Sequence, residues 1–272
     1  MPKRLNPTEI LPSMAKAQAL LTKYEWTIGQ RLADYQLQIP ETFVHQAGAY
    51  PIPIYWAYNN EFSKAVGLDL TPYAGQTVLA TIYSLKEDLP TFLQPYTKAR
   101  AVIVTARDKI IGAWIDKGRH YAFACSLNRK PFEEIVGRSW GDWLVTAGVV
   151  NPQDRLEQQL ARLAPEQIIT DYYAAHQKQP SEQAYVYVSR KALTDYLFAN
   201  MGDAVLFNKD YAAAYAGLNP VETPQPTRLT GMSMIGSGDD WLEYRVDGLG
   251  FVILRKEVAN LGWRVESIGT GP

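Results

Sequence analysis

The stretch "TDYYAAHQ" carries the residue types best suited to proton transfer in this chain of 272 residues. Tyr172 and His176 are spaced i and i+4, so a helix places both rings on one face, and Asp171 precedes them directly. A tyrosine or histidine that faces a pocket can polarise a carbonyl group or move a proton. The same spacing is typical of a half-buried amphipathic helix, so packing is the alternative role for these catalytic candidates.

Trp56 is a second candidate, as a surface contact. Aromatic residues crowd the segment that holds Tyr50, Tyr55, Trp56 and Tyr58, and one stripe of a helix there can form core. That stripe leaves Trp56 as a candidate exposed residue, of a type that is common at binding surfaces. Core packing is the alternative role for this side chain.

Motifs for metals and cofactors are missing. His45, His120 and His176 lie in three separate segments, and none is spaced from another as metal ligands are. The glycine-rich nucleotide loops and the serine-hydrolase elbow do not occur either. The lone Cys125 excludes an intrachain disulfide, and we expect it to be structural. The sequence therefore predicts no metal site, no cofactor and no catalytic set.

Composition excludes further classes. Apolar residues make up 47% and charged residues 20% of the chain, which predicts a packed core. The net charge of −1 lacks the basic excess of a nucleic-acid binder. No run approaches the ~18 apolar residues of a membrane span. The N-terminal segment "MPKRLNPTEILPSMAK" lacks the apolar stretch of a signal peptide, so we expect no targeting segment in the chain as given.

Hydrophobic periodicity places an α+β domain first. We predict one helix over Met14–Tyr24, with Ser13 as N-cap, and a second over Ile54–Val66, with Pro53 in its first turn. The pattern then changes from the period of a helix to that of a strand. Strands are expected at Tyr35–Ile39, Gln76–Leu85, Ala99–Ala106, Lys109–Ile115 and His120–Leu127, followed by a short helix within "RKPFEEIVG".

For the remainder of the chain, the sequence predicts helices followed by an antiparallel meander of strands. Asn151 is the expected N-cap of a helix over Gln153–Leu163, whose apolar stripe is Leu156, Leu160 and Leu163. Further predicted elements are helices at 165–177 and 189–201, a proline-rich loop at 219–227, and four strands between Arg228 and Ile268. We therefore predict an α+β domain over 1–148, a helical connector over 149–164 and a second α+β domain over 165–272.

The strand "WLEYRV" predicts two different faces for the last sheet. Leu242, Tyr244 and Val246 alternate with Trp241, Glu243 and Arg245. The charged side chains then lie opposite the best apolar set. An enzyme pocket between this apolar face and the helix at 165–177 would lack an acidic partner from the sheet, which weakens the catalytic hypothesis.

Several segments of the first half resemble a bacterial family, the domain of unknown function 4830. They are "KAQALLTKYEW", "IPETF", "YNNEFSKAVGLDLTPYAGQTV", "DKIIGAWID" and "FEEIVGRSWGDWL", and the resemblance covers roughly residues 14–144. The second half, which ends in "WRVESIGTGP", is similar to small domains with the cystatin-like or nuclear-transport-factor-like cone fold. Both resemblances imply architecture, and neither implies an activity or a catalytic residue set. The resemblance also implies a localisation: an exported or membrane-anchored protein whose leader is absent. A cytoplasmic protein is the alternative.

Three hypotheses of function follow from the sequence. The first is a non-catalytic interaction protein that binds a protein or a small ligand. The second is a cone-fold enzyme that uses Asp171, Tyr172 and His176 for proton transfer or hydrolysis. The third is a homodimer formed through the C-terminal sheet, because open sheet faces are able to associate.

Overall fold

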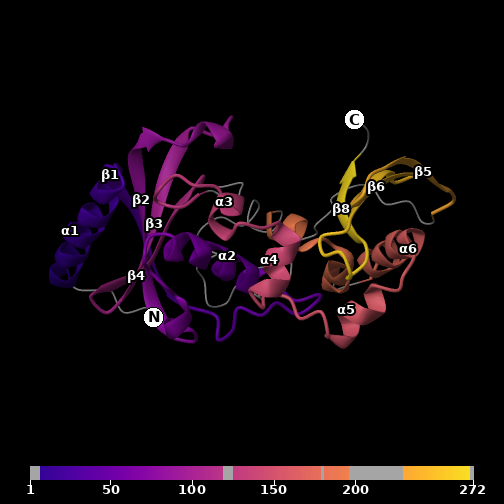
Figure 1. The fold of residues 1–272 in the computed structure, drawn as a ribbon, viewed down its shortest axis with the longest axis horizontal. Helices are drawn as coiled ribbons and strands as arrows, with labels where there is room; N and C mark the ends of the chain where they lie inside the picture. Colours follow the sequence, from indigo (N-terminus) through magenta and orange to yellow (C-terminus); the bar gives the residue numbers. More distant parts are fainter. Residues whose placement is uncertain (1–6, 119–124, 179–180, 196–228, 270–272) are drawn as a thin grey trace. The chain divides into compact units, whose positions relative to one another are not determined.

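The chain folds into two compact units, which we describe separately. The computed structural model describes residues 7–118, 125–178, 181–195 and 229–269 (Figure 1). Of these, unit 1 takes the residues up to Thr42 and Tyr55–Gly137, and unit 2 takes Phe43–Ile54 and the remainder. Each unit holds a four-stranded antiparallel sheet, which confirms the predicted α+β class with two sheet-bearing parts.

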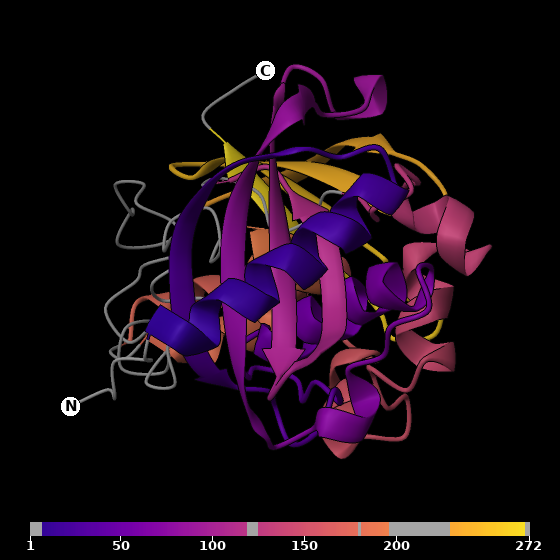
Figure 2. The same ribbon diagram turned by 90° about the vertical axis from the view of Figure 1, so that its left-hand side faces the viewer.

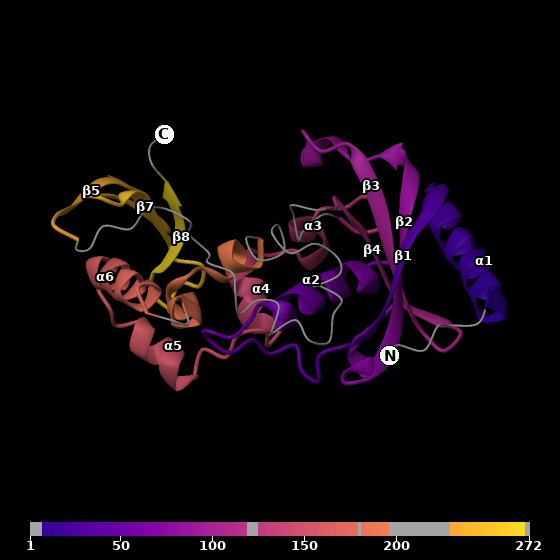
Figure 3. The same ribbon diagram turned by 180° about the vertical axis from the view of Figure 1, so that it is seen from behind.

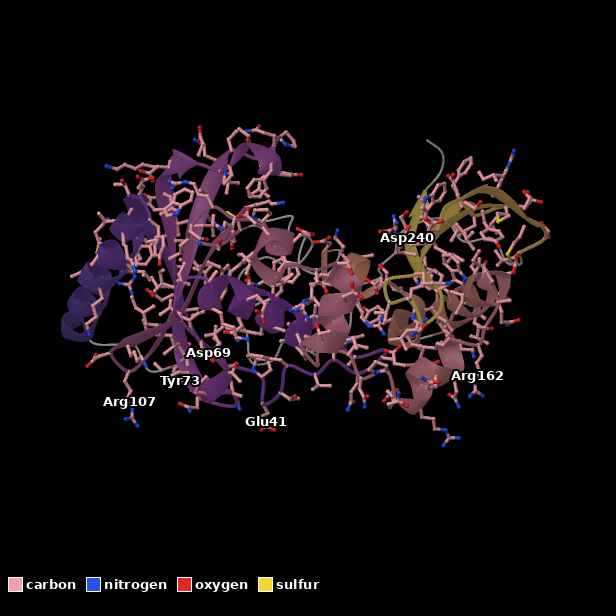
Figure 4. All side chains as sticks on the ribbon, in the orientation of Figure 1. Glu41, Asp69, Tyr73, Arg107, Arg162 and Asp240 are labelled. Atoms are coloured by element: carbon pink, nitrogen blue, oxygen red, sulfur yellow. The ribbon has the colours of Figure 1, made fainter. Side chains whose placement is uncertain are left out.

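The sheet of unit 1 is a meander in chain order. Its strands are β1 (Ile28–Gln38), β2 (Thr77–Asp88), β3 (Lys98–Ala106) and β4 (Lys109–Asp116). β3 and β4 are joined by a tight hairpin, because Arg107 and Asp108 form the whole connection and Ala106 pairs with Lys109. Arg107 takes a φ of 52°, as a two-residue hairpin turn requires, and it extends from the end of the sheet (Figure 4).

Two helices pack on opposite faces of this sheet. α1 (Pro7–Lys23) crosses the face of β1–β4 in Figure 2, and α2 (Ile52–Lys64) lies behind the sheet in that view. The α1 face buries Ala17 and Leu21 completely. The helix begins at Pro7, so the prediction of Ser13 as its N-cap is wrong; Pro7 suits the first helical position because its missing N–H has no partner to lose there.

Short helices complete unit 1 and the start of unit 2. They are η1 (Thr71–Tyr73), η2 (Thr91–Leu93), α3 (Phe132–Val136) and α4 (Trp140–Thr146). Ser139 caps α4 by accepting a hydrogen bond from the backbone N–H of Asp142. Most of the strand predicted over His120–Leu127 lies outside the described residues, although Cys125 forms a backbone bridge to Ile115 of β4.

Unit 2 pairs a helical layer with its own meander. The helices are α5 (Arg155–Leu160), α6 (Pro165–His176) and η3 (Ser181–Tyr187), and the strands are β5 (Met232–Ser237), β6 (Trp241–Val246), β7 (Gly250–Arg255) and β8 (Arg264–Gly269). Figure 3 shows α6 beneath one face of this sheet. The core between them includes Ile168, Ile169, Tyr244 and Leu254.

The start of α5 corrects two predictions. Asp154 caps the helix and accepts from the backbone N–H groups of Leu156 and Glu157, whereas Asn151 accepts from Gln153 in the preceding turn. The buried side chains of α5 are Glu157 and Leu160, while Leu156 is 37% exposed. The inward face is therefore rotated from the predicted leucine stripe, and it carries a carboxylate into the interior.

Two further predictions reach beyond the described residues. A helix begins at Arg190 and continues to residue 195, and the remainder of the predicted helix 189–201 is outside the described part. The predicted loop at 219–227 lies outside it entirely.

Candidate functional site

The structure brings two of the three α6 candidates together in the core of unit 2. The rings of Tyr172 and His176 stack with their centroids 5.8 Å apart and their planes 7° from parallel. Tyr172 is 2% and His176 is 5% exposed, and Tyr172 belongs to the apolar cluster between α6 and the sheet. Their predicted i, i+4 proximity is confirmed, and their burial matches the packing role that the sequence left open.

Asp171 lies on a different side of α6. Its carboxylate accepts a hydrogen bond of 2.7 Å from the Nε2 atom of Gln167, one turn earlier on the exposed side of the helix. Burial, together with the nearby Asp171 charge, raises the pKa of Tyr187 in η3. The acidic candidate therefore faces η3 and solvent instead of the buried rings, and the three side chains do not form one acid–base set.

Tyr244 of β6 joins the sheet to the first turn of α6. Its hydroxyl donates a hydrogen bond of 2.7 Å to Oε1 of Glu166. Burial, followed by this hydrogen bond to the carboxylate, raises the pKa of Tyr244 to about 12. The phenol is therefore neutral near pH 7 and acts as a donor that fixes α6 over β6.

Unit 2 also contains a buried cluster of four charges, which the sequence analysis missed. We call the side chains of Glu157, Arg190, Glu257 and Arg264 the charge cluster; all four are at most 5% exposed. Glu157 pairs with Arg190 and, at 2.8 Å, with Nη2 of Arg264. Glu257 pairs with Nη1 of Arg190 at 3.3 Å. Two carboxylates balance two guanidinium groups, which is the condition for burying charge at tolerable cost.

Glu257 makes the most contacts within the charge cluster. Its carboxylate accepts from the backbone N–H groups of Arg190 and Lys191, both at 2.8 Å, and from the indole N–H of Trp140 at 3.2 Å. The first two contacts satisfy N–H groups at the start of the helix that follows η3. Gly141 leaves room for this segment, because a Cβ atom there would lie 1.7 Å from the Glu257 carbonyl oxygen. The cluster therefore joins segments that are far apart in the sequence.

The pKa values of the two buried arginines shift in opposite directions. Burial alone would lower the pKa of Arg190, but Glu257 and Glu157 outweigh it and raise that pKa. Burial, with the like charge of Arg190, lowers the pKa of Arg264 to about 10. The difference follows from the geometry, because Arg190 contacts two carboxylates and Arg264 contacts one. Both guanidinium groups therefore remain charged near neutral pH, and their ion pairs hold the segments of the charge cluster together.

His45 borders the charge cluster. The ring is 4% exposed, and its Nε2 atom lies 3.1 Å from the carbonyl oxygen of Ala49, which assigns the proton of the neutral ring to Nε2. Burial first, and then the positive charge of Arg190, lowers the pKa of His45 to about 4. His45 is therefore neutral at pH 7 and ties Phe43–Ile54 to unit 2.

The second face of the β5–β8 sheet is the candidate binding surface. We define the open face as Trp241, Glu243, Arg245, Phe251 and Ile253, whose alternation and register place them opposite the α6 side. Arg245 is exposed and the other four are partly exposed. None of the described helices lies over this face, whereas α6 lies under the other (Figures 1 and 3).

Two glycines shape one end of the open face. A Cβ atom at Gly236 would lie 3.1 Å from the Trp241 ring, and one at Gly238 would lie 2.2 Å from its Nε1 atom. The indole therefore lies directly against the β5–β6 hairpin, and a side chain at either glycine would have to displace it. Asp240, in the turn of this hairpin, pairs with Arg255 at 3.1 Å (Figure 4).

The prediction of Trp56 as an exposed contact is wrong. Its side chain is 2% exposed and packs edge-to-face against Tyr55 and Trp114, with centroid distances of 6.1 and 6.0 Å. α2 is buried around most of its circumference, so the position beside the predicted stripe is also core. Cys125 is fully buried, and burial raises the pKa of its thiol to about 12, in agreement with a structural role.

The described residues define a class of protein: a two-unit α+β chain with one sheet enclosed by helices and a second sheet with an open face. Residues 20–115, which run from the last turn of α1 into β4, match the model of a family described as a domain of unknown function (DUF4830). This confirms the resemblance predicted for the first half, while the cone resemblance of the second half stays a prediction. No curated protein and no solved structure matches the chain.

Two searches of the described residues complete the site. None of their helices is long and apolar enough to cross a membrane. Within the same residues, no group of three or more histidine, cysteine, aspartate or glutamate side chains is arranged to hold a metal ion.

Proposed function

We propose that this chain is a non-catalytic interaction protein and that the open face of unit 2 is its binding surface. One observation carries the proposal: the open face presents Trp241, Phe251 and Ile253 to solvent in part, while none of the described helices covers it. Aromatic residues surrounded by charges are typical of the centre of protein interfaces.

The placement of the acid–base candidates supports the same proposal. Tyr172 and His176 are enclosed by the core, and Asp171 lies on another side of the helix. The hydroxyl of Tyr244 is bonded to Glu166 and holds α6 on the sheet. Binding through a rigid sheet face needs no residue with a shifted pKa, because shape and apolar contact supply the affinity.

Site-specific photo-crosslinking in the native host tests the proposal. A benzophenone amino acid replaces Ser267, which is exposed on β8 and pairs with Ile253, so that its side chain joins the open face. The matched control carries the same group at Thr170, an exposed position on α6. We expect adducts from position 267 and none from position 170; equal or absent adducts at both positions would overturn the proposal.

A further inference from the structure

Glu243 and Arg245 are the charges of the open face that have no ion-pair partner among the described residues. They lie at i and i+2 on β6, so both point to the same side of the sheet. Their cross-strand neighbours are Ile253 and Phe251 on β7, and Gly236 and Ser233 on β5, none of which is charged. Opposite charges held side by side on one rigid strand form a self-complementary pair.

We propose that the partner of the open face is a second copy of this chain, bound face to face about a two-fold axis. This inference rests on the proposed function and names its partner. The axis lies between the two sheets, perpendicular to the strands, at the level of Tyr244 on β6. Rotation about it reverses the strand direction and places Arg245 of each copy opposite Glu243 of the other, which gives two equivalent ion pairs.

The same axis also pairs the apolar residues. On β7, Phe251 is opposite Arg245 and Ile253 is opposite Glu243, so Val252 lies at the level of Tyr244. The rotation therefore places Phe251 of one copy over Ile253 of the other, twice. A single operator therefore satisfies both the charges and the apolar side chains, and a shift of one copy along the strands would separate both sets together.

The outer strands allow two such faces to approach. Ser233 on β5 and Ser267 on β8 occupy the open-face positions beside Arg245 and Ile253, and a serine side chain is short enough for sheets stacked about 10 Å apart. Arg255 at the edge is already bonded to Glu266 at 2.8 Å and to Asp240 at 3.1 Å. Because Arg255 is already paired, Arg245 is the cation of this face that a second copy would neutralise.

The small area of the open face predicts a weak dimer. Four strands about 4.8 Å apart and six residues long at about 3.3 Å per residue span roughly 400 Å² in projection, or about 800 Å² for two copies. This area is below the roughly 1,200 Å² of a stable interface, so we expect a reversible dimer that dissociates on dilution.

Charge-swap variants test the inference by sedimentation equilibrium from about 1 µM to about 1 mM, the range in which small interfaces dissociate. R245E places two carboxylates opposite each other at both ion-pair positions, and we expect it to raise the dimer Kd at least about tenfold; E243R is expected to do the same with two cations. The double variant E243R/R245E restores opposite charges and should return the Kd to within about threefold of the original.

R162E is the matched control, because Arg162 is an exposed arginine outside the open face (Figure 4). Its Kd should equal that of the original chain, and unchanged melting of all variants establishes that they fold. A chain that stays monomeric at every concentration overturns the inference, as does a double variant that remains as weak as R245E. In that case, adducts from position 267 to a different protein would leave the proposed function intact, and their absence would remove both.

Discussion

The neutral state of His45 makes a quantitative prediction for the pH dependence of unit 2. The perturbation is a decrease in pH from 7 to 5, in the original chain and in His45→Gln. A glutamine side-chain N–H can replace the Nε2 proton toward Ala49, but the amide does not titrate. The comparison therefore isolates the protonation of His45 from that of all other groups.

The sign follows from the direction of the pKa shift. The pKa of His45 is lowered from 6.5 to about 4 by burial and by Arg190, so the unfolded chain takes up a proton first as the pH falls. The stabilisation by the neutral ring is fully present above pH 6.5 and is lost as the pH falls towards 4. Glu157 and Glu257 also face His45 and oppose the shift, but they are outweighed.

The magnitude comes from the same two values. A separation of about 2.5 pKa units corresponds to a total of about 3.4 kcal/mol, at 1.36 kcal/mol per unit. Between pH 7 and pH 5, about 2 kcal/mol of this is lost. We expect the original chain to lose about 2 kcal/mol more than His45→Gln over that interval.

Native-state hydrogen exchange of the β6 and β7 amides is the assay, because these buried strands report the opening free energy of unit 2 alone. The exchange rates are corrected for the intrinsic effect of pH. If the two proteins lose stability in parallel between pH 7 and pH 5, His45 titrates equally in the folded and unfolded states, and the reasoning from its burial is refuted.

Three further predictions concern other buried groups. Glu257→Gln should destabilise unit 2 by about 3–5 kcal/mol in urea unfolding, because Arg190 loses a buried carboxylate; Asp240→Asn, at an exposed pair, should cost less than about 1 kcal/mol, and equal costs would contradict the account. Tyr244→Phe should cost about 1–2 kcal/mol through the lost bond to Glu166, and an unchanged unfolding midpoint would exclude that bond. Cys125 should react with a thiol-specific chromogenic reagent only in denaturant, so labelling of the folded protein would refute its burial.

The strands were predictable because their signal is local. Alternation of residue types and short turns identify β2, β3, β4 and the C-terminal meander without knowledge of distant contacts. The two faces of β6 followed from the same alternation, and the structure buries Tyr244 and Val246 on the α6 side. The i, i+4 contact between Tyr172 and His176 is local as well, so the helix alone brings the rings together.

Burial of charge was not predictable, because the partners are distant in the sequence. Glu157 and Arg264 lie 107 positions apart, and each by itself is typical of a surface residue. The position of Glu157 three residues before the buried Leu160 is a weak signal that it shares the inner face of α5. The prediction for Trp56 was wrong for a related reason. A single apolar stripe implies that the rest of the helix faces solvent, but most positions of α2 are buried by other parts of the chain, which the periodicity of α2 cannot reveal.

The two faces of the β5–β8 sheet differ in how much their side chains contribute to folding. α6 has twelve residues and is therefore about 18 Å long, close to the length of a six-residue strand, and together with Leu160 of α5 and Ala184 of η3 it forms the core on one face of the sheet. Tyr244, Val246, Val252 and Leu254 supply the apolar surface for that contact. Phe251 and Ile253 face away from α6 and stay partly exposed. They therefore contribute less hydrophobic stabilisation to the described part of unit 2 than the buried residues do. A sheet face without a partner is expected to carry polar residues, so the pairing of apolar side chains with two opposite charges supports the proposal that the open face is a binding surface.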